Sequence, residues 1–177
     1  SVSPAWDPKG EFLYFLSDRN LRTLVGAPWG NRRPEPYFDK EVEVYQLALR
    51  PGLRSPFLPD DELKKPSGAS TPAAAPTAPP AGTPAARSDS GPKPITIALD
   101  GLPLRIRRVP LPSGNYEALF ANSEALFVTS RGSGADAKTD LVALKLGNEK
   151  PEGVVVVDDI RSAELSGNGK KLLVHKG

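Results

Sequence analysis

Residues 3–15 read SPAWDPKGEFLYF and carry the feature that decides the fold. Trp6 precedes a four-residue turn, DPKG, which ends at Gly10 and leads through a charged residue into an apolar strand. Pro8 presets the backbone angle φ for a turn, and Gly10 can adopt the positive φ that most residues avoid. The stretch therefore predicts a β-hairpin.

The same pattern occurs twice more in the chain. Residues 162–174 read SAELSGNGKKLLV and align without a gap 159 positions downstream of the first copy. Residues 116–128 read YEALFANSEALFV and align 113 positions downstream, with Ser123 in the place of Gly10. A hairpin that recurs along the chain indicates a repeat architecture. In each copy we expect the apolar residue before the turn, Trp6 in the first, to lie between stacked sheets.

The spacing of the hairpins predicts four-stranded blades. The two later copies start 159 − 113 = 46 residues apart, close to the ~40–45 residues of a propeller blade. Two further strands, 141–146 and 154–157, are expected between them. The first interval is 113 − 46 = 67 residues longer, yet it holds only two further strand candidates, 42–49 and 104–111. We therefore expect an all-β chain: a partial β-propeller of about two four-stranded antiparallel blades plus a hairpin of the next.

The blade count determines the expected organisation of the chain. Closed propellers have ~4–8 blades, so we do not expect this chain to close a ring alone. Its terminal strands would be exposed edges, which favour self-association. The expected boundaries are 1–64 for the first blade (strands in 1–17 and 42–49, long loop 18–41), 65–94 for a linker inserted in that blade, 95–158 for the end of the first blade and the second blade, and 159–177 for the first hairpin of a third.

The linker 65–94 is distinguished by its composition. It is rich in Pro, Ala, Gly, Ser and Thr, and no Val, Ile, Leu or aromatic residue occurs between Leu63 and Ile95. Such a segment buries too little apolar surface to offset the entropy that it would lose on ordering. We interpret it as a flexible surface spacer, with a proline-motif docking site as the alternative.

Composition excludes several classes of function. The 177 residues carry a formal net charge of only +2, so neither nucleic acid nor a membrane is an expected partner. The longest apolar runs, such as residues 154–157, are far shorter than the ~20 residues of a transmembrane helix. Because the chain has no cysteine, it has no disulfide and no thiolate chemistry. We expect no cofactor and no metal.

We expect no catalytic residue on this chain. The single histidine, His175, has no evident acidic partner, and Ser133 lies in the sequence GSGAD, which is not a nucleophile elbow. Asp158, Asp159 and residues 60–62 are acidic, but neither group has the spacing of a calcium-binding loop. We interpret both groups as turn residues at strand ends.

The candidate contact residues for a peptide or a partner protein are loop aromatics and arginines. Exposed aromatic side chains on loops are frequent contact residues. Arginines bind carboxylates through their forked guanidinium groups, and solvated surface charge is the alternative role for them. The candidates are Trp29, Arg32, Arg33, Tyr37, Arg105 and Arg107.

Several segments together resemble a known group of proteins. Residues 3–10 and 12–19 resemble the blade signature of TolB-like and tricorn-type β-propellers. The following segments, in this order, are similar to the propeller portion of bacterial tricorn-like serine proteases, relatives of the tail-specific proteases: SPFLPDDE at 55–62, ITIALDGL at 95–102, RRVPLP at 107–112 and GNY at 114–116. The similarity covers nearly the whole chain apart from the linker.

The resemblance implies a function. In tricorn-like proteases two propellers precede a PDZ domain and a serine-peptidase core, and most catalytic residues lie downstream of the propellers. The resemblance thus implies a non-catalytic segment that forms a channel wall, gates peptides and contributes to assembly. Peptide or protein substrates would be reached through the parent protease, in a bacterial cytoplasm or periplasm, which the sequence does not distinguish. The alternative is a TolB-type protein-interaction propeller with no protease attached.

Overall fold

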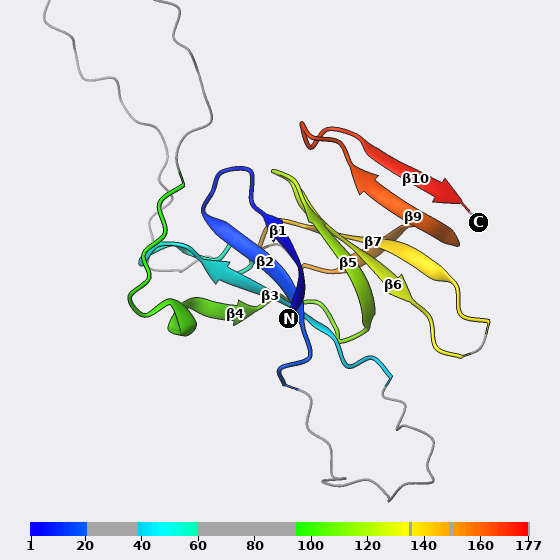
Figure 1. Cartoon of the computed structure of the whole chain (residues 1–177), viewed down its shortest axis with the longest axis horizontal. Coiled ribbons are helices and arrows are strands. Elements are labelled where there is room, and N and C mark those ends of the chain that lie inside the picture. The colour runs from blue at the N-terminus through cyan, green and yellow to red at the C-terminus, as the bar shows by residue number, and fades with distance from the viewer. Residues whose placement is uncertain (21–38, 60–94, 135, 149–150, 177) are drawn as a thin grey trace, which may run out of the picture.

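In the computed structural model, antiparallel β-strands form nearly all the regular structure of the chain (Figure 1). The structure describes residues 1–20, 39–59, 95–134, 136–148 and 151–176. The linker 65–94 and most of the expected loop 18–41 lie outside these described residues. Within the described ranges, no helix has the length and apolar character needed to cross a bilayer.

The first sheet contains four strands in the order in which they occur in the chain. They are β1 (Val2–Trp6), β2 (Phe12–Ser17), β3 (Glu43–Ala48) and β4 (Ile106–Arg108). Long segments separate β2 from β3 and β3 from β4, yet both pairs are hydrogen-bonded neighbours. The chain therefore leaves this sheet twice and returns each time beside the strand that it left.

The predicted strand 104–111 is wrong in its extent. β4 has only three residues, and a short 3-10 helix, η1 (Leu102–Arg105), precedes it. Gly101 enters this helix with a left-handed φ of 66°, and Pro103 has a fixed φ that suits its first turn. Pro110 has no N–H group to donate to a neighbouring strand, so the pairing ends before it.

A second four-stranded sheet and a hairpin complete the fold, and Figure 1 shows the three units arranged side by side. The strands are β5 (Asn115–Ala121), β6 (Ala125–Arg131), β7 (Thr139–Lys145) and β8 (Gly153–Val157) in the sheet, and β9 (Ile160–Leu165) and β10 (Leu172–Lys176) in the hairpin. Two four-stranded antiparallel sheets and a third hairpin confirm the predicted partial β-propeller.

The turns of the first and third hairpins have the same geometry. Gly10 and Gly169 have φ values of 67° and 68°. The N–H of Gly10 donates to the carbonyl of Asp7, and the N–H of Gly169 donates to that of Ser166, each at 2.8 Å. Both glycines therefore adopt the left-handed conformation that their sequence pattern predicts.

The middle hairpin is shorter, so the gapless alignment of residues 116–128 is wrong around its turn. Four residues separate the paired Ala121 and Leu126, whereas six separate the corresponding pairs in the other two hairpins. Asn122 closes the short turn, because its Oδ1 accepts hydrogen bonds from two backbone N–H groups. Ser123 is therefore not the counterpart of the turn glycine in the other copies.

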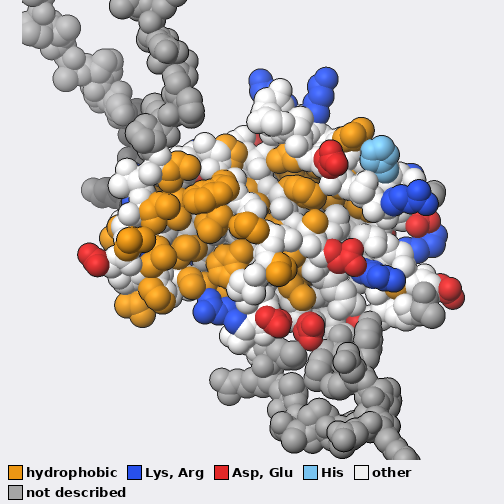
Figure 2. Space-filling view, in the orientation of Figure 1, with side chains coloured by type: hydrophobic (Ala, Val, Ile, Leu, Met, Phe, Trp, Pro, Cys, Tyr) orange, Lys and Arg blue, Asp and Glu red, His pale blue; other side chains and the backbone are white. Residues whose placement is uncertain are grey.

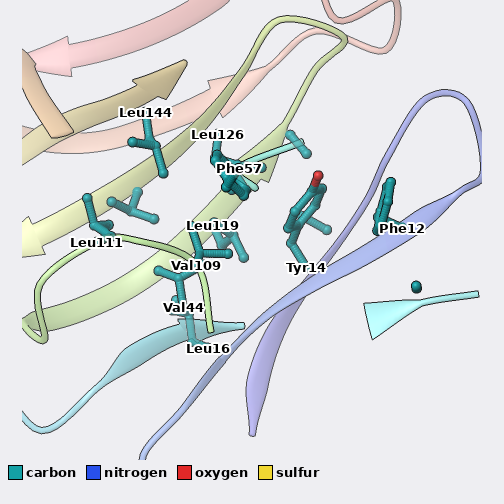
Figure 3. Close-up of a cluster of buried hydrophobic side chains, with 14 residues drawn as sticks. Phe12, Tyr14, Leu16, Val44, Phe57, Val109, Leu111, Leu119, Leu126 and Leu144 are labelled. Atoms are coloured by element: carbon teal, nitrogen blue, oxygen red, sulfur yellow. The ribbon is translucent and has the colours of Figure 1, made fainter. Parts of the chain in front are cut away.

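A hydrophobic core fills the space between the two four-stranded sheets, and Figure 3 shows its side chains directed into that space. Tyr14, Leu16 and Val44 of the first sheet are at most 1% exposed. Leu119 and Leu126 of the second sheet are 5% and 1% exposed and belong to the same cluster. Each of the two sheets therefore buries its core-facing side chains only by packing against the other sheet.

The opposite face of the second sheet packs against the hairpin. Leu141 of β7 joins Ile160 and Ala163 of β9 in a smaller buried cluster. Trp6, in contrast, is 48% exposed, so the prediction that it lies between stacked sheets of this chain is wrong. Its neighbour Ala5 belongs to the core instead, because successive side chains of a strand point to opposite faces.

We expect Leu16→Ala to lower the free energy of unfolding by about 2–5 kcal/mol, because the change leaves a cavity in the shared core. Leu99→Ala is the matched control, since Leu99 is 76% exposed, and such surface changes alter stability by less than about 0.5 kcal/mol. Urea unfolding followed by circular dichroism measures both variants. Equal effects of the two substitutions would contradict the shared core.

Candidate functional site

A cavity of about 530 Å³ opens at one end of the first sheet. Its walls come from the start of β2, the end of β3 and parts of the segments 50–58 and 100–107. Four arginines line it, and Asp100 is the carboxylate among its described lining residues. We name it the arginine pocket, defined by Gln46, Arg50, Arg54, Arg105 and Arg107.

Arg105 connects two segments of the pocket wall through hydrogen bonds. Its Nε donates to the carbonyl of Ala48 at 3.0 Å, and its Nη1 donates to that of Asp100 at 2.7 Å. Its Nη2 donates to the carbonyl of Ala98. Three hydrogen bonds to main-chain oxygens fix this guanidinium, so Arg105 joins the end of β3 to the segment before η1 and holds a positive charge at a set position.

Arg107 is the pocket arginine with the most available donors. Its side chain is exposed and makes no hydrogen bond or ion pair with the described residues. Arg50 lies 3.7 Å from the carboxylate of Glu11, and Arg54 donates to the carbonyl of Pro59. Within the described part of the chain, the guanidinium of Arg107 therefore has all its donors available to an incoming acceptor.

Gln46 contributes a buried polar group to the same pocket. The residue is 2% exposed, and its side-chain Oε1 has no hydrogen-bond donor among the described residues. A buried acceptor without a donor costs about 1–3 kcal/mol. Gln46 is directly opposite Arg107 in the pairing of β3 with β4. The residue with the unsatisfied oxygen is thus the direct cross-strand partner of Arg107.

The structure brings two of the sequence-predicted contact residues, Arg105 and Arg107, into one pocket. Trp29, Arg32, Arg33 and Tyr37 lie outside the described residues.

Sequence reasoning missed Gln46, Arg50 and Arg54 as members of the pocket. A signal exists for Gln46, because it is a polar residue between the apolar side chains of Tyr45 and Leu47. Nothing local marks Arg50 and Arg54, whose positions depend on how the following segment folds over the sheet.

A second polar cluster surrounds Glu43, which is 9% exposed, at the other end of β3. Its carboxylate accepts hydrogen bonds from the hydroxyl of Tyr45 at 2.5 Å and from Asn20 at 3.2 Å, and pairs with Arg108 at 3.0 Å. Burial of the ring, together with the hydrogen bond to Glu43, raises the pKa of Tyr45 to about 12. Each oxygen of this carboxylate is engaged, which indicates a structural role.

The acidic residues at the end of the second sheet also have partners. Asp158 accepts a hydrogen bond from Lys176 at 3.1 Å, and Asp159 accepts one from Lys138 at 2.6 Å. In the described part of the chain, no three metal-ligating side chains form a cluster. His175 is exposed on β10. The acidic residues 60–62 lie outside the described residues.

Asp39 connects the approach to β3 with the second sheet. Its carboxylate accepts hydrogen bonds from the hydroxyl of Ser133, at 2.8 and 2.7 Å, and from the amide of Asn115 at 2.7 Å. Chiefly these hydrogen bonds hold the pKa of Asp39 below its ordinary value of 3.8. We name this cluster the Asp39 latch, because it fastens the two sheets together at their rim.

The outer face of the first sheet carries a row of apolar side chains. Trp6, Leu13, Leu47 and Ile106 are consecutive partners across all four strands, and we name them the Trp6 row. Each is at least partly exposed. Figure 2 shows hydrophobic side chains gathered over the first sheet, whereas charged side chains dominate near the hairpin. The outer face of the first sheet thus presents partly exposed apolar side chains.

The fold is similar to part of a known protein. The chain superposes on the crystal structure of the tricorn protease with a TM-score of 0.60 and 20% sequence identity. The alignment covers 98% of this chain and 15% of the tricorn protease chain. This likeness shows a tricorn-like fold. No protein-family model and no curated protein matches the chain.

The Asp39 latch predicts a measurable pKa change. Ser133→Ala removes a donor to the carboxylate and should raise the pKa of Asp39 toward 3.8. Carboxyl-carbon NMR titration measures this pKa, with Ser162→Ala as the control on an exposed serine of β9. An unchanged Asp39 pKa in Ser133→Ala would contradict the latch.

The lowered pKa of Asp39 also determines how the stability of the chain changes with pH. Because the folded-state pKa of Asp39 is lowered, its stabilisation is present above the unfolded pKa and is lost as the pH falls through the folded value. Urea unfolding below pH 4 should therefore show a smaller acid-induced loss of stability in Ser133→Ala than in the unmodified chain. A larger loss would contradict this sign.

Proposed function

We propose that this chain is a non-catalytic β-propeller segment of a tricorn-like serine peptidase. In this role it forms part of a channel wall, helps to gate peptides and provides a surface for assembly. The observation that carries the proposal is the superposition of 98% of the chain on 15% of the tricorn protease chain. That share suits a few blades of a larger multidomain protein.

The Trp6 row supports an assembly role. Each four-stranded sheet of a propeller packs on both faces, and the second sheet has a packed neighbour on each side. The first sheet has one packed face and one face that presents Trp6 at 48% exposure. Another blade-like sheet, from the same or another chain, is the expected neighbour of this outer face.

The arrangement of polar groups supports a non-catalytic role. Ser133 donates its hydroxyl proton to the Asp39 carboxylate and has no histidine among its partners. His175 is paired with Ser162 across the β9–β10 hairpin, and Figure 1 shows this hairpin on the opposite side of the molecule from β4. The peptidase chemistry would come from other parts of the parent protein.

The assembly role predicts that Trp6→Asp reduces self-association of the 177-residue chain. A carboxylate in the middle of an apolar contact is costly to bury, so the weight-average mass should fall toward that of a monomer. Sedimentation equilibrium measures it. The control is Leu99→Asp, which adds the same charge at an exposed apolar residue outside the row. A chain that is monomeric before any substitution would contradict the assembly surface.

Two observations test the link to a peptidase: the coding sequence downstream of this chain, and an assay of peptide cleavage by the chain itself. We expect the coding sequence past Gly177 to specify PDZ-like and serine-peptidase-like segments, and the 177-residue chain to leave peptide substrates uncleaved. If no peptidase-like segment follows, the TolB-type interaction propeller is the better description. Hydrolysis by the 177-residue chain, abolished by a serine-directed inhibitor, would contradict the non-catalytic role.

A further inference from the structure

The arginine pocket concentrates more positive charge around one cavity than its own side chains neutralise. Arg105 is fixed by three main-chain carbonyls, and Arg107 lies two residues further along the chain in the same pocket. Arg50 reaches Glu11 only at 3.7 Å, with both side chains more than a third exposed. Positive charges that line one cavity repel one another, and a bound anion would reduce that repulsion.

We propose that the arginine pocket binds an organic oxyanion, with the carboxylate or phosphate group of the ligand held by Arg107. A guanidinium presents parallel N–H donors that match two oxygens of such a group. Arg105 cannot turn away, since its donors hold the backbone, so it adds a fixed positive charge beside the bound anion. This assignment does not depend on the chain being part of a peptidase.

Gln46 supplies a second point of recognition. Its Oε1 is buried and has no donor among the described residues, and it lies across the strand pair from Arg107. Residues directly opposite in an antiparallel pair have Cβ atoms about 4.5–5.5 Å apart. A ligand whose anionic group is on Arg107 can therefore place an N–H or O–H group against Gln46. An acceptor beside a cation selects a ligand that carries both a donor and a negative charge.

The remaining walls of the pocket suit an apolar ligand body. Leu53 is half-buried, and Leu58 and Leu104 are 37% and 86% exposed. A cavity of about 530 Å³ lies within the ~300–1,000 Å³ range of small-molecule pockets. The fitting ligand is thus an amphipathic anion about the size of an acylated amino acid, which either a peptide C-terminus or a phosphorylated small molecule can provide.

The test is isothermal titration calorimetry on the full chain with three probes. N-acetyl-leucine carries a carboxylate, an N–H group and an apolar body, N-acetyl-leucinamide lacks the charge, and phenyl phosphate carries the alternative oxyanion. We expect at least one of the two anions to bind and the neutral amide to bind at least tenfold more weakly. The tighter of the two anions identifies the source of the oxyanion. Binding should weaken as salt is raised.

Two variants and one control assign the binding to the pocket. Arg107→Ala should weaken binding of the anion roughly tenfold or more, in line with the loss of charge-assisted hydrogen bonds. Arg161→Ala, on an exposed arginine of β9, should leave it unchanged. Gln46→Leu should weaken binding while the melting temperature stays equal or rises, because it removes an unsatisfied buried group.

Three results would overturn the proposal. They are no binding of either anion at 10 mM, equal binding of the neutral amide, and equal affinity in Arg107→Ala and the unmodified chain. A Gln46→Leu variant that melts at a lower temperature and binds normally would overturn the role given to Gln46. Circular dichroism of each variant confirms that the fold is retained.

Discussion

Burial of the apolar face of one β-sheet against the next sheet is the constraint on which the rest of this structure depends. Leu16 and Val44 are buried because Leu119 and Leu126 cover them, and the reverse is equally true. A four-stranded sheet with apolar residues on both faces is unstable alone, since both faces would remain in water. The repeated units stack side by side, so that the second sheet covers one face of the first and the β9–β10 hairpin covers the other face of the second.

The same stacking explains where polar groups gather. The sheet interiors are apolar, so charged and hydrogen-bonding groups collect at strand ends, in the Asp39 latch, around Glu43 and in the arginine pocket. The latch and the Glu43 cluster are internally satisfied. The arginine pocket is not, because Gln46 lacks a donor and Arg107 lacks an acceptor within the described residues. The unsatisfied groups distinguish a candidate binding site from structural ion pairs.

The recurrence of the hairpin pattern of residues 3–15 was sufficient to predict the fold, because turn chemistry at Gly10 is local and the spacing of the copies gives the number of strands in a blade. It was harder to predict which side chains of a strand point into the core. Trp6 lies on the outer face, since alternation along β1 places Ala5 in the core. The pocket could be predicted only in part. Arg105 and Arg107 are marked as a basic cluster in the sequence, whereas Gln46 joins them through the pairing of β3 with β4, between segments distant in sequence.

Native-state hydrogen exchange of the β2 and β6 amides is the most direct measurement of whether the stacked sheets form one cooperative unit. If the shared core couples them, Leu16→Ala in β2 will lower the opening free energy of the Leu126 and Val128 amides in β6 by about as much as that of the β2 amides. If the β6 amides keep their protection while the β2 amides lose theirs, the two sheets are independent. The account of this chain as stacked propeller blades would then be contradicted.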